Sequence, residues 1–464
     1  MEQETKQARR KIFSMILPIT AENILQTTAS FISMAMIGNI DALSVSAISV
    51  SAIGISSRIT QIVWAIFKGV TTGTTVYVSQ AYGAGDFKKL KNIVKETFIL
   101  CMFIVILLQQ FIYWNTTRLL SFFNPDTLLL ESGSMYLRIV SIGLPFQVIV
   151  LLVAGILQGM GNAKTPMLIA FLMNLLNIGA GYLLIFGKLG ITALGLKGAA
   201  IGLVIAQTIA ALIGLYLLSK KYKFLSLKKQ DDAPGIALGN AIQVFRLGLP
   251  SSTESIFWQI SALILTRAIL VFGNNVLAAY QLGLQAESIS FTPASGFAVA
   301  ATAFIGQSLG SGNGERGKLY IRELLKGTLA ITLICSLVLL IMPKQIMGLL
   351  TSNKEVISIG ATYLFFMGLV QFPQNISGLL NGAMRGAGYS NVPMFVAGIG
   401  IWIIRIPLVL VVTYVLHLDI YFIWIVFCTD LITRFIISLV LYKRKNIYNA
   451  IPLVEKRMEE SLEA

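Results

Sequence analysis

The chain has 464 residues, of which 56% are hydrophobic and only 12% are charged, and its formal net charge is +15. A soluble domain carries roughly 25% charged residues, so this charge density argues against a soluble enzyme, a disordered chain and a fibrous protein. In so apolar a chain, the positive charge indicates basic loops on one side of a bilayer rather than a nucleic-acid partner.

Twelve stretches are long and apolar enough for membrane helices, which need about 20 mostly apolar residues. The N-terminal MEQETKQARRKIF does not have the pattern of a secretory signal, so we expect the apolar run after it to be retained as the first helix. The expected spans, in chain order, are 14–38, 46–79, 95–115, 133–158, 166–187, 198–219, 244–272, 277–309, 324–343, 357–384, 392–416 and 420–442.

Basic residues indicate the orientation. With a cytoplasmic N-terminus, 25 Lys and Arg residues fall in cytoplasmic segments (Arg385 among them), 5 in outside loops and 6 within spans, which accounts for all 36. This bias predicts a multi-pass plasma-membrane protein with both termini in the cytoplasm. We expect an N-lobe at 1–219, a cytoplasmic linker at 220–243, a C-lobe at 244–445 and a cytoplasmic tail at 446–464.

The two halves repeat three motifs in the same order. Because each half has an even number of spans, both halves begin on the same side, and the repeat is parallel. Such duplicated bundles are typical of transporters that bind substrate between the halves and rock them to alternate access. The matched pairs are LPITAENILQ (17–26) with LPSSTESIFW (249–258), VSQAYGAG (78–85) with IGQSLGSG (305–312), and QGMGNAKTPM (158–167) with RGAGYSNVPM (385–394).

The ordered set of motifs resembles the multidrug and toxic compound extrusion (MATE) family, in its bacterial NorM/DinF-like branch, over about residues 10–445. The resemblance implies an all-α membrane fold of twelve helices in two pseudo-symmetric six-helix lobes around a V-shaped cavity. It also implies an antiporter that exports amphipathic, often cationic, compounds in exchange for H⁺ or Na⁺, without a cofactor. The motifs that carry it are G-x-G-x-x-x-x-P-M after the fourth span, Q-x-x-G-x-G after the eighth, NLLNIGAGYLLIFG (174–187), GLKGAAIGLVIAQ (195–207) and WIIRIPL (402–408).

The chain departs from the family at the positions of its coupling acids. The aspartate that many members carry late in the first helix falls on Ser33. In the fifth helix Asn177 is present, but the aspartate position four residues later is Gly181. The family's acid in the tenth helix is absent from 357–384. These departures favour H⁺ over Na⁺ as the coupling ion.

Four acidic residues fall inside expected spans and are our candidates for cation coupling: Glu254, Glu287, Asp430 and Glu22. An ionised acid at the centre of a bilayer costs roughly 2.5 kcal/mol or more, so such a residue faces a cavity or a partner. We rank Glu254 first because its helix begins the second lobe and some family members use a glutamate in this helix.

Each candidate has a structural alternative. Glu254 could form an ion pair with Arg267 or Arg405, and Glu287 could pair with Arg267. Asp430 lies four residues before Arg434 on one helix face, which favours an internal pair. Glu22, the repeat counterpart of Glu254, could instead be solvated near the cytoplasmic end of its helix.

Polar and aromatic residues at helical spacing are candidates for the cavity lining. Their alternative roles are interhelical hydrogen bonds for the polar side chains and packing for the aromatic ones. Trp258 could hold flat cations by stacking and cation–π attraction. The full set is Gln26, Ser33, Gln61, Asn174, Asn177, Trp258 and Gln281.

Other chemistry has little support in the sequence. There is no G-x-x-x-x-G-K-[ST] motif for ATP, and three cysteines and one histidine have no metal-site spacing. The glycine-rich GAGDFKK (83–89) and GSGNGERGK (310–318) are expected to be helix-capping turns. We expect a monomeric non-enzyme whose partners are small organic molecules and membrane lipids. The alternatives are a lipid-linked or oligosaccharide flippase of the same superfamily and a membrane-embedded lipid-modifying enzyme.

Overall fold

The computed structural model describes residues 2–38, 43–123, 125–190, 192–225 and 238–453, and these residues form helices and short connections without a strand. Ten of the described helices are long and apolar enough to cross a membrane. The long elements are α1 (Glu2–Gly38), α2 (Leu43–Gly83), α3 (Phe87–Trp114), α5 (Thr127–Gly159), α6 (Lys164–Phe186), α7 (Gly195–Tyr216), α8 (Gly239–Leu270), α9 (Asn274–Gly310), α10 (Gly314–Ile341), α12 (Lys354–Gly386) and α15 (Ile420–Arg444).

A further long segment is helical but irregular. It consists of α13 (Asn391–Gly398), the π-helical η2 (Ile399–Arg405), α14 (Ile406–Leu410) and the π-helical η3 (Val411–Val415). With this segment, the long helices coincide one for one with the expected spans, to within a few residues at most ends, although α1, α3, α5 and α10 begin earlier. The remaining elements are the short α4 (Thr116–Ser121), η1 (Leu217–Lys221) and α11 (Pro343–Leu350). Half of the expected linker, at 226–237, and most of the expected tail, at 454–464, lie outside the described residues.

The two glycine-rich segments are tight turns between helices, as the sequence predicts. Gly85 and Gly312 have positive φ angles of 72° and 66°, which glycine adopts at little cost. The side chains of Asp86 and Asn313 then accept hydrogen bonds from the first turns of α3 and α10. Equivalent positions of the repeat therefore begin equivalent helices in the same way.

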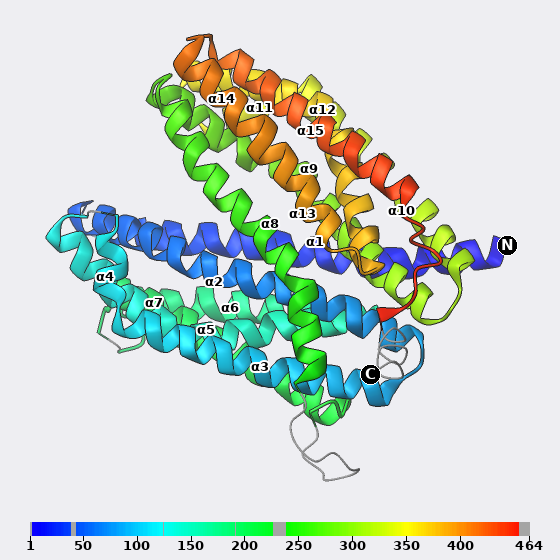
Figure 1. The fold of residues 1–464 in the computed structure, drawn as a ribbon. Coiled ribbons are helices and arrows are strands. Elements are labelled where there is room, and N and C mark those ends of the chain that lie inside the picture. Colours follow the sequence, from blue (N-terminus) through cyan, green and yellow to red (C-terminus); the bar gives the residue numbers. More distant parts are fainter. Residues whose placement is uncertain (1, 39–42, 124, 191, 226–237, 454–464) are drawn as a thin grey trace.

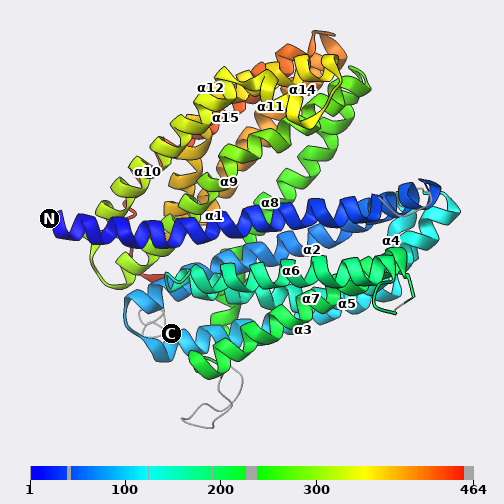
Figure 2. The same ribbon diagram turned by 180° about the vertical axis from the view of Figure 1, so that it is seen from behind.

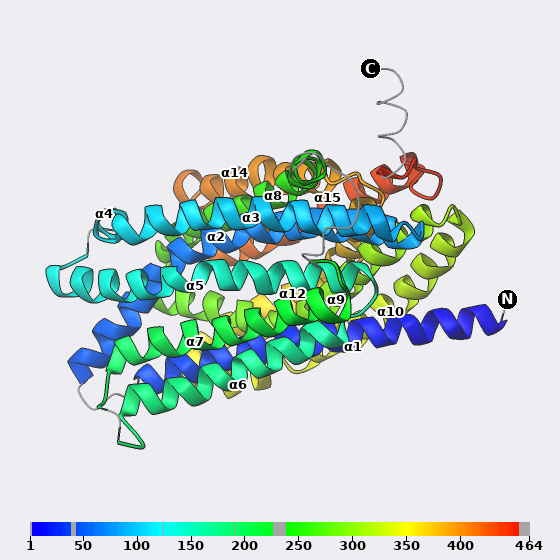
Figure 3. The same cartoon turned by 90° about the horizontal axis from the view of Figure 1, so that it is seen from below.

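The helices form two arms that meet at one end and diverge toward the other (Figure 1). One arm holds α2 to α7 and the other holds α9 to α15, and the view from behind shows the same V (Figure 2). Seen from below, the long helices of the near arm run side by side (Figure 3). The N-terminal end of α1 and the end of α15 lie where the arms meet, whereas α4 and α11 lie where the arms are apart.

Two helices cross from one arm to the other. The beginning of α1, with Ile12 and Met15, packs in a hydrophobic core with residues of α9, α10 and α12. The beginning of α8, with Val244, packs in the core of the first arm with α2 and α3. Each helix contains a proline, Pro18 and Pro250, near these contacts with the opposite arm. The beginning of each of these repeat-related helices thus packs against the opposite arm, and this exchange ties the arms together.

The arms are closed at their meeting end by a symmetric pair of glutamines. Gln80 of α2 donates a hydrogen bond to the carbonyl of Gly386 (3.0 Å), and Gln307 of α9 donates one to the carbonyl of Gly159 (2.8 Å). The helices approach so closely that a Cβ at Gly83 would lie 2.2 Å from the Gln307 carbonyl oxygen. We call these two hydrogen bonds the glutamine clasp.

Candidate functional site

A cavity of about 650 Å³ lies between the arms, above the glutamine clasp. Its volume is within the range of roughly 300–1,000 Å³ typical of small-molecule sites. Helices α2 and α5 contribute one wall, and α8, α9, α12, α13, η2 and α15 contribute the rest. Phe291 and Trp258 are exposed to 53% and 40%, so the cavity opens to the space between the arms. Its charged lining consists of Lys68, Glu254, Glu287, Arg385, Arg405 and Arg434.

Glu254 forms an ion pair with Arg385, a partner that we did not anticipate. The Glu254 Oε2 and Arg385 Nη2 atoms are 2.5 Å apart, and both side chains are mostly buried. The sequence interpretation placed Arg385 in a cytoplasmic segment after the tenth span. Because α12 continues to Gly386, Arg385 lies within its last turn rather than after the span, and it lines the cavity. Neither Arg267 nor Arg405 forms an ion pair with Glu254 in the described residues.

The internal repeat contains the signal that would have identified this partner. Arg385 is the repeat counterpart of Gln158, just as Glu254 is the counterpart of Glu22. In the first arm the Gln158 amide nitrogen lies 3.5 Å from the Glu22 carboxylate, a long hydrogen bond. The two arms thus hold the same pair of positions together, with an ion pair in one arm and a weaker contact in the other.

Glu22 is not among the described residues that line the cavity. Its residue is half-buried and interacts electrostatically with Lys68. The Lys68 ammonium lies over the ring of Trp64, 5.8 Å from its centre. Lys68 is the charged residue that α2 contributes to the described cavity lining, so the other charges come from the second arm.

Asp430 is fully buried and is shared by two arginines. Arg434, one turn along α15, donates hydrogen bonds to both carboxylate oxygens, one of them from Nε at 2.7 Å. The Arg405 Nε atom lies 2.6 Å from Oδ2, although its N–H is not directed along a hydrogen bond. The Asp430–Arg434 pair, which helical spacing indicates, is thus present, and η2 adds a second arginine to it.

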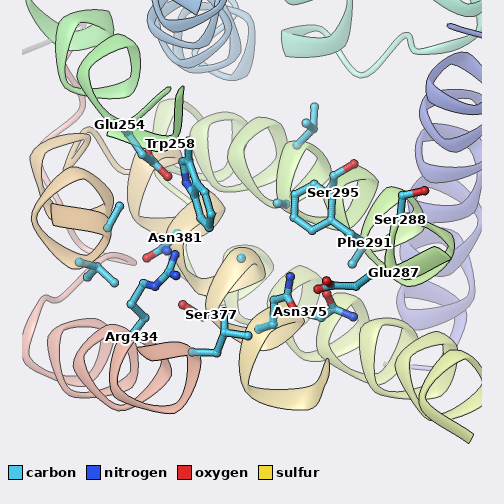
Figure 4. A pocket seen from close by; sticks show the side chains of 18 of the residues that line it. Glu254, Trp258, Glu287, Ser288, Phe291, Ser295, Asn375, Ser377, Asn381 and Arg434 are labelled. Carbon is cyan, nitrogen blue, oxygen red and sulfur yellow. The ribbon is translucent and has the colours of Figure 1, made fainter. Parts of the chain in front are cut away.

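Glu287 is buried in the cavity wall and accepts a hydrogen bond from the hydroxyl of Tyr363 (2.6 Å). Among the described residues it has no ion pair, with Arg267 or any other base. Nearby, Asn375 donates to the hydroxyls of Thr332 (3.0 Å) and Ser290 (3.3 Å). Figure 4 shows Glu287 and Asn375 beside each other and apart from Glu254 and Trp258. The carboxylates of α8 and α9 therefore occupy separate ends of the cavity.

The predicted lining residues are distributed unevenly. Trp258 lines the cavity, and the guanidinium groups of Arg434 and Arg405 lie 4.8 and 5.3 Å from its ring centre. Asn177 donates a hydrogen bond to Ser33 (3.2 Å), which joins α6 to α1. Asn177, Ser33 and the other predicted polar residues all lie outside the described lining of this cavity: Asn174 is buried, and Gln26, Gln61 and Gln281 are exposed.

Comparison with known proteins gives consistent matches along the chain. The MatE family model matches residues 18–183 and again 250–411, once in each half. A probable multidrug resistance protein NorM of Thermotoga maritima is 27% identical over 459 residues, covering 99% of this chain and 97% of that protein.

Solved structures show the same fold. A mutant of the Vibrio cholerae MATE transporter VcmN superposes with a TM-score of 0.87 at 19% identity, covering 96% of this chain and 99% of that one. A multidrug resistance MATE family transporter described in an outward-facing conformation superposes with a TM-score of 0.83 at 19% identity, covering 94% and 95% of the two chains.

Proposed function

The chain belongs to the MatE family of multidrug efflux transporters, and from this we propose that it is a secondary active antiporter. It exports amphipathic, often cationic, organic compounds in exchange for H⁺ or Na⁺ by alternating access. The observation that carries the proposal is the cavity between two repeat-related arms, closed at one end by the glutamine clasp and lined by membrane-embedded carboxylates.

We assign coupling first to Glu254. Protonation of its carboxylate removes the charge that holds Arg385, and a bound Na⁺ would compete with Arg385 for the same oxygens. Arg385 directly precedes Gly386, whose carbonyl accepts the Gln80 hydrogen bond of the clasp. Binding of the cation at Glu254 therefore acts on the residue next to the closed end of the cavity. Glu287, Asp430 and Glu22 remain secondary candidates.

The proposed orientation places both termini in the cytoplasm of a plasma-membrane protein. The clasp then closes the cytoplasmic end, and the arms diverge toward the outside. In this state the cavity releases its substrate outward and takes up the coupling cation. Opening of the clasp gives the cytoplasm access to the same cavity, as rocking of two halves requires.

The test is uptake of a fluorescent cation into everted vesicles under an imposed ΔpH or ΔpNa. Replacement of Glu254 by glutamine is expected to lower the initial uptake rate at least tenfold, because a coupling carboxylate can no longer gain and lose the cation. The matched control is Glu315→Gln, which changes an exposed glutamate paired with Lys318 and is expected to retain wild-type uptake. Unchanged transport by the Glu254 variant under both gradients would refute the coupling assignment.

A further inference from the structure

The charges around Asp430 do not balance locally. One fully buried carboxylate faces two arginines, Arg405 and Arg434. Glu254 forms its ion pair with Arg385 and has only a weaker electrostatic interaction with Arg434. The cluster of Arg405, Asp430 and Arg434, which we call the arginine pair site, therefore carries one excess positive charge. Both arginines line the cavity, at 7% and 8% exposure, so the excess charge faces the transported compound.

The backbone is shaped to hold this cluster. Arg405 ends the π-helical segment η2, and such irregular turns are frequent at functional sites. Gly400, in the same segment, leaves room for the pair, since a Cβ there would lie 2.3 Å from the Asp430 Oδ1 atom. The cluster therefore depends on the π-helical segment and on the absence of a side chain at Gly400, neither of which the packing of apolar helices requires.

The arginines also retain unused donors. Two guanidinium groups offer ten N–H bonds, whereas one carboxylate has about four acceptor sites. Both guanidinium groups lie near Trp258, and that of Arg405 also lies 4.6 Å from the ring centre of Phe427. The two guanidinium groups therefore form a positively charged site beside the partly exposed ring of Trp258. A planar anion attached to an apolar body fits this chemistry, because guanidinium groups bind carboxylates and phosphates bidentately.

We propose that Arg405, Arg434 and Trp258 form a subsite for an anionic group of the transported amphipath, a carboxylate, sulfonate or phosphate. This inference rests on the proposed transport function and refines its substrate class: the preferred compounds carry an anion, with or without a cationic group. A compound without an anionic group gains nothing at this subsite, and its cationic group can face Glu254 or Glu287 elsewhere in the cavity.

Rhodamine B and its ethyl ester test the subsite, since esterification replaces the carboxylate with a neutral ester and keeps the cationic ring system. Titration of the purified full-length protein with each dye, followed by fluorescence anisotropy, is expected to show about tenfold tighter binding of rhodamine B. The variant Arg434→Gln leaves a neutral Arg405–Asp430 pair and so does not strand a buried carboxylate. It is expected to remove the preference while changing ester affinity less than about twofold. Lys344→Gln, at an exposed site, is the control.

The opposite change gives a second, independent measurement. Asp430→Asn increases the positive charge and is expected to tighten binding of rhodamine B relative to its ester. Equal binding of both dyes to the wild type, or an equal loss of both in Arg434→Gln, would overturn the subsite. If the wild-type protein prefers rhodamine B but shows no gradient-driven dye uptake in everted vesicles, antiport is refuted and the subsite is retained.

A lipid headgroup is the other source of the same anion. Competition of rhodamine B by short-chain phosphatidylglycerol, but not by phosphatidylcholine, would assign the subsite to an anionic lipid and favour a flippase. Competition by neither lipid would assign it to free amphipaths.

Discussion

At the scale of single residues, Gly400 is the position on which the arginine pair site depends most directly. A methyl group there would overlap Asp430 and the side chain of Arg434. We expect Gly400→Ala to destabilise the protein by about 2–4 kcal/mol, because the clash separates a buried ion pair. Thermal unfolding of the purified protein, followed by intrinsic fluorescence, measures the loss.

Gly378→Ala is the matched control. Gly378 also lies in a long membrane helix, but a Cβ there meets no atom within 4 Å. Alanine is the better helix former by roughly 1 kcal/mol, so this variant is expected to melt at or above the wild-type temperature. Equal melting temperatures for the two variants would show that Gly400 does not support the cluster.

The sequence indicates these sites unequally. The Asp430–Arg434 pair follows from helical spacing because both residues lie on one regular helix. Arg405 comes from a different element, the π-helical segment η2, so spacing along α15 does not predict its contact with Asp430. The pairing of Glu254 with Arg385 needed the repeat, which relates it to Glu22 and Gln158.

At the scale of elements, the spans were predictable because apolar length determines which segments can cross a bilayer. The exchange of α1 and α8 was not predictable, because apolar length does not specify which neighbouring helices a membrane helix packs against. Arg9 pairs with Glu323 of α10, and Asn240 donates to Glu96 of α3 (2.6 Å each). These polar contacts anchor the exchanged segments, but many other pairings of surface charges are equally compatible with the sequence.

The glutamine clasp leads to a prediction about α2 and α9. Loss of either hydrogen bond should favour opening of the closed end, because each buried carbonyl then lacks its partner. We expect Gln80→Ala and Gln307→Ala each to shift the population toward wider separation, and the double variant to shift it further. Double electron–electron resonance between spin labels at Lys88 and Glu315, in the first turns of α3 and α10, reports this separation.

Gln285→Ala provides the control for the clasp variants, because Gln285 is an exposed glutamine on the same α9 helix. Its distance distribution should match that of the wild type. If the double variant at Gln80 and Gln307 also retains the wild-type distribution, the clasp does not hold the closed end.

At the scale of the whole molecule, shape and charge distribution together predict which side of the membrane reaches the cavity. The arms diverge away from the described ends of the chain, and the basic segments predict that those ends are cytoplasmic. A cysteine at Ser288, which lines the cavity, should therefore react with a membrane-impermeant maleimide in intact cells and not in everted vesicles without a gradient. The background is a variant in which Cys101, Cys335 and Cys428 are replaced by alanine.

A cysteine at Lys88, exposed at the start of α3, should give the opposite pattern, with labelling only in everted vesicles. An imposed gradient that drives transport should then make position 288 reactive in everted vesicles, because rocking of the arms exposes the same cavity to the other side. Labelling of position 288 from the cytoplasmic side alone would reverse the orientation. Labelling from both sides without a gradient would mean that the clasp does not seal the cavity, which is incompatible with coupled exchange.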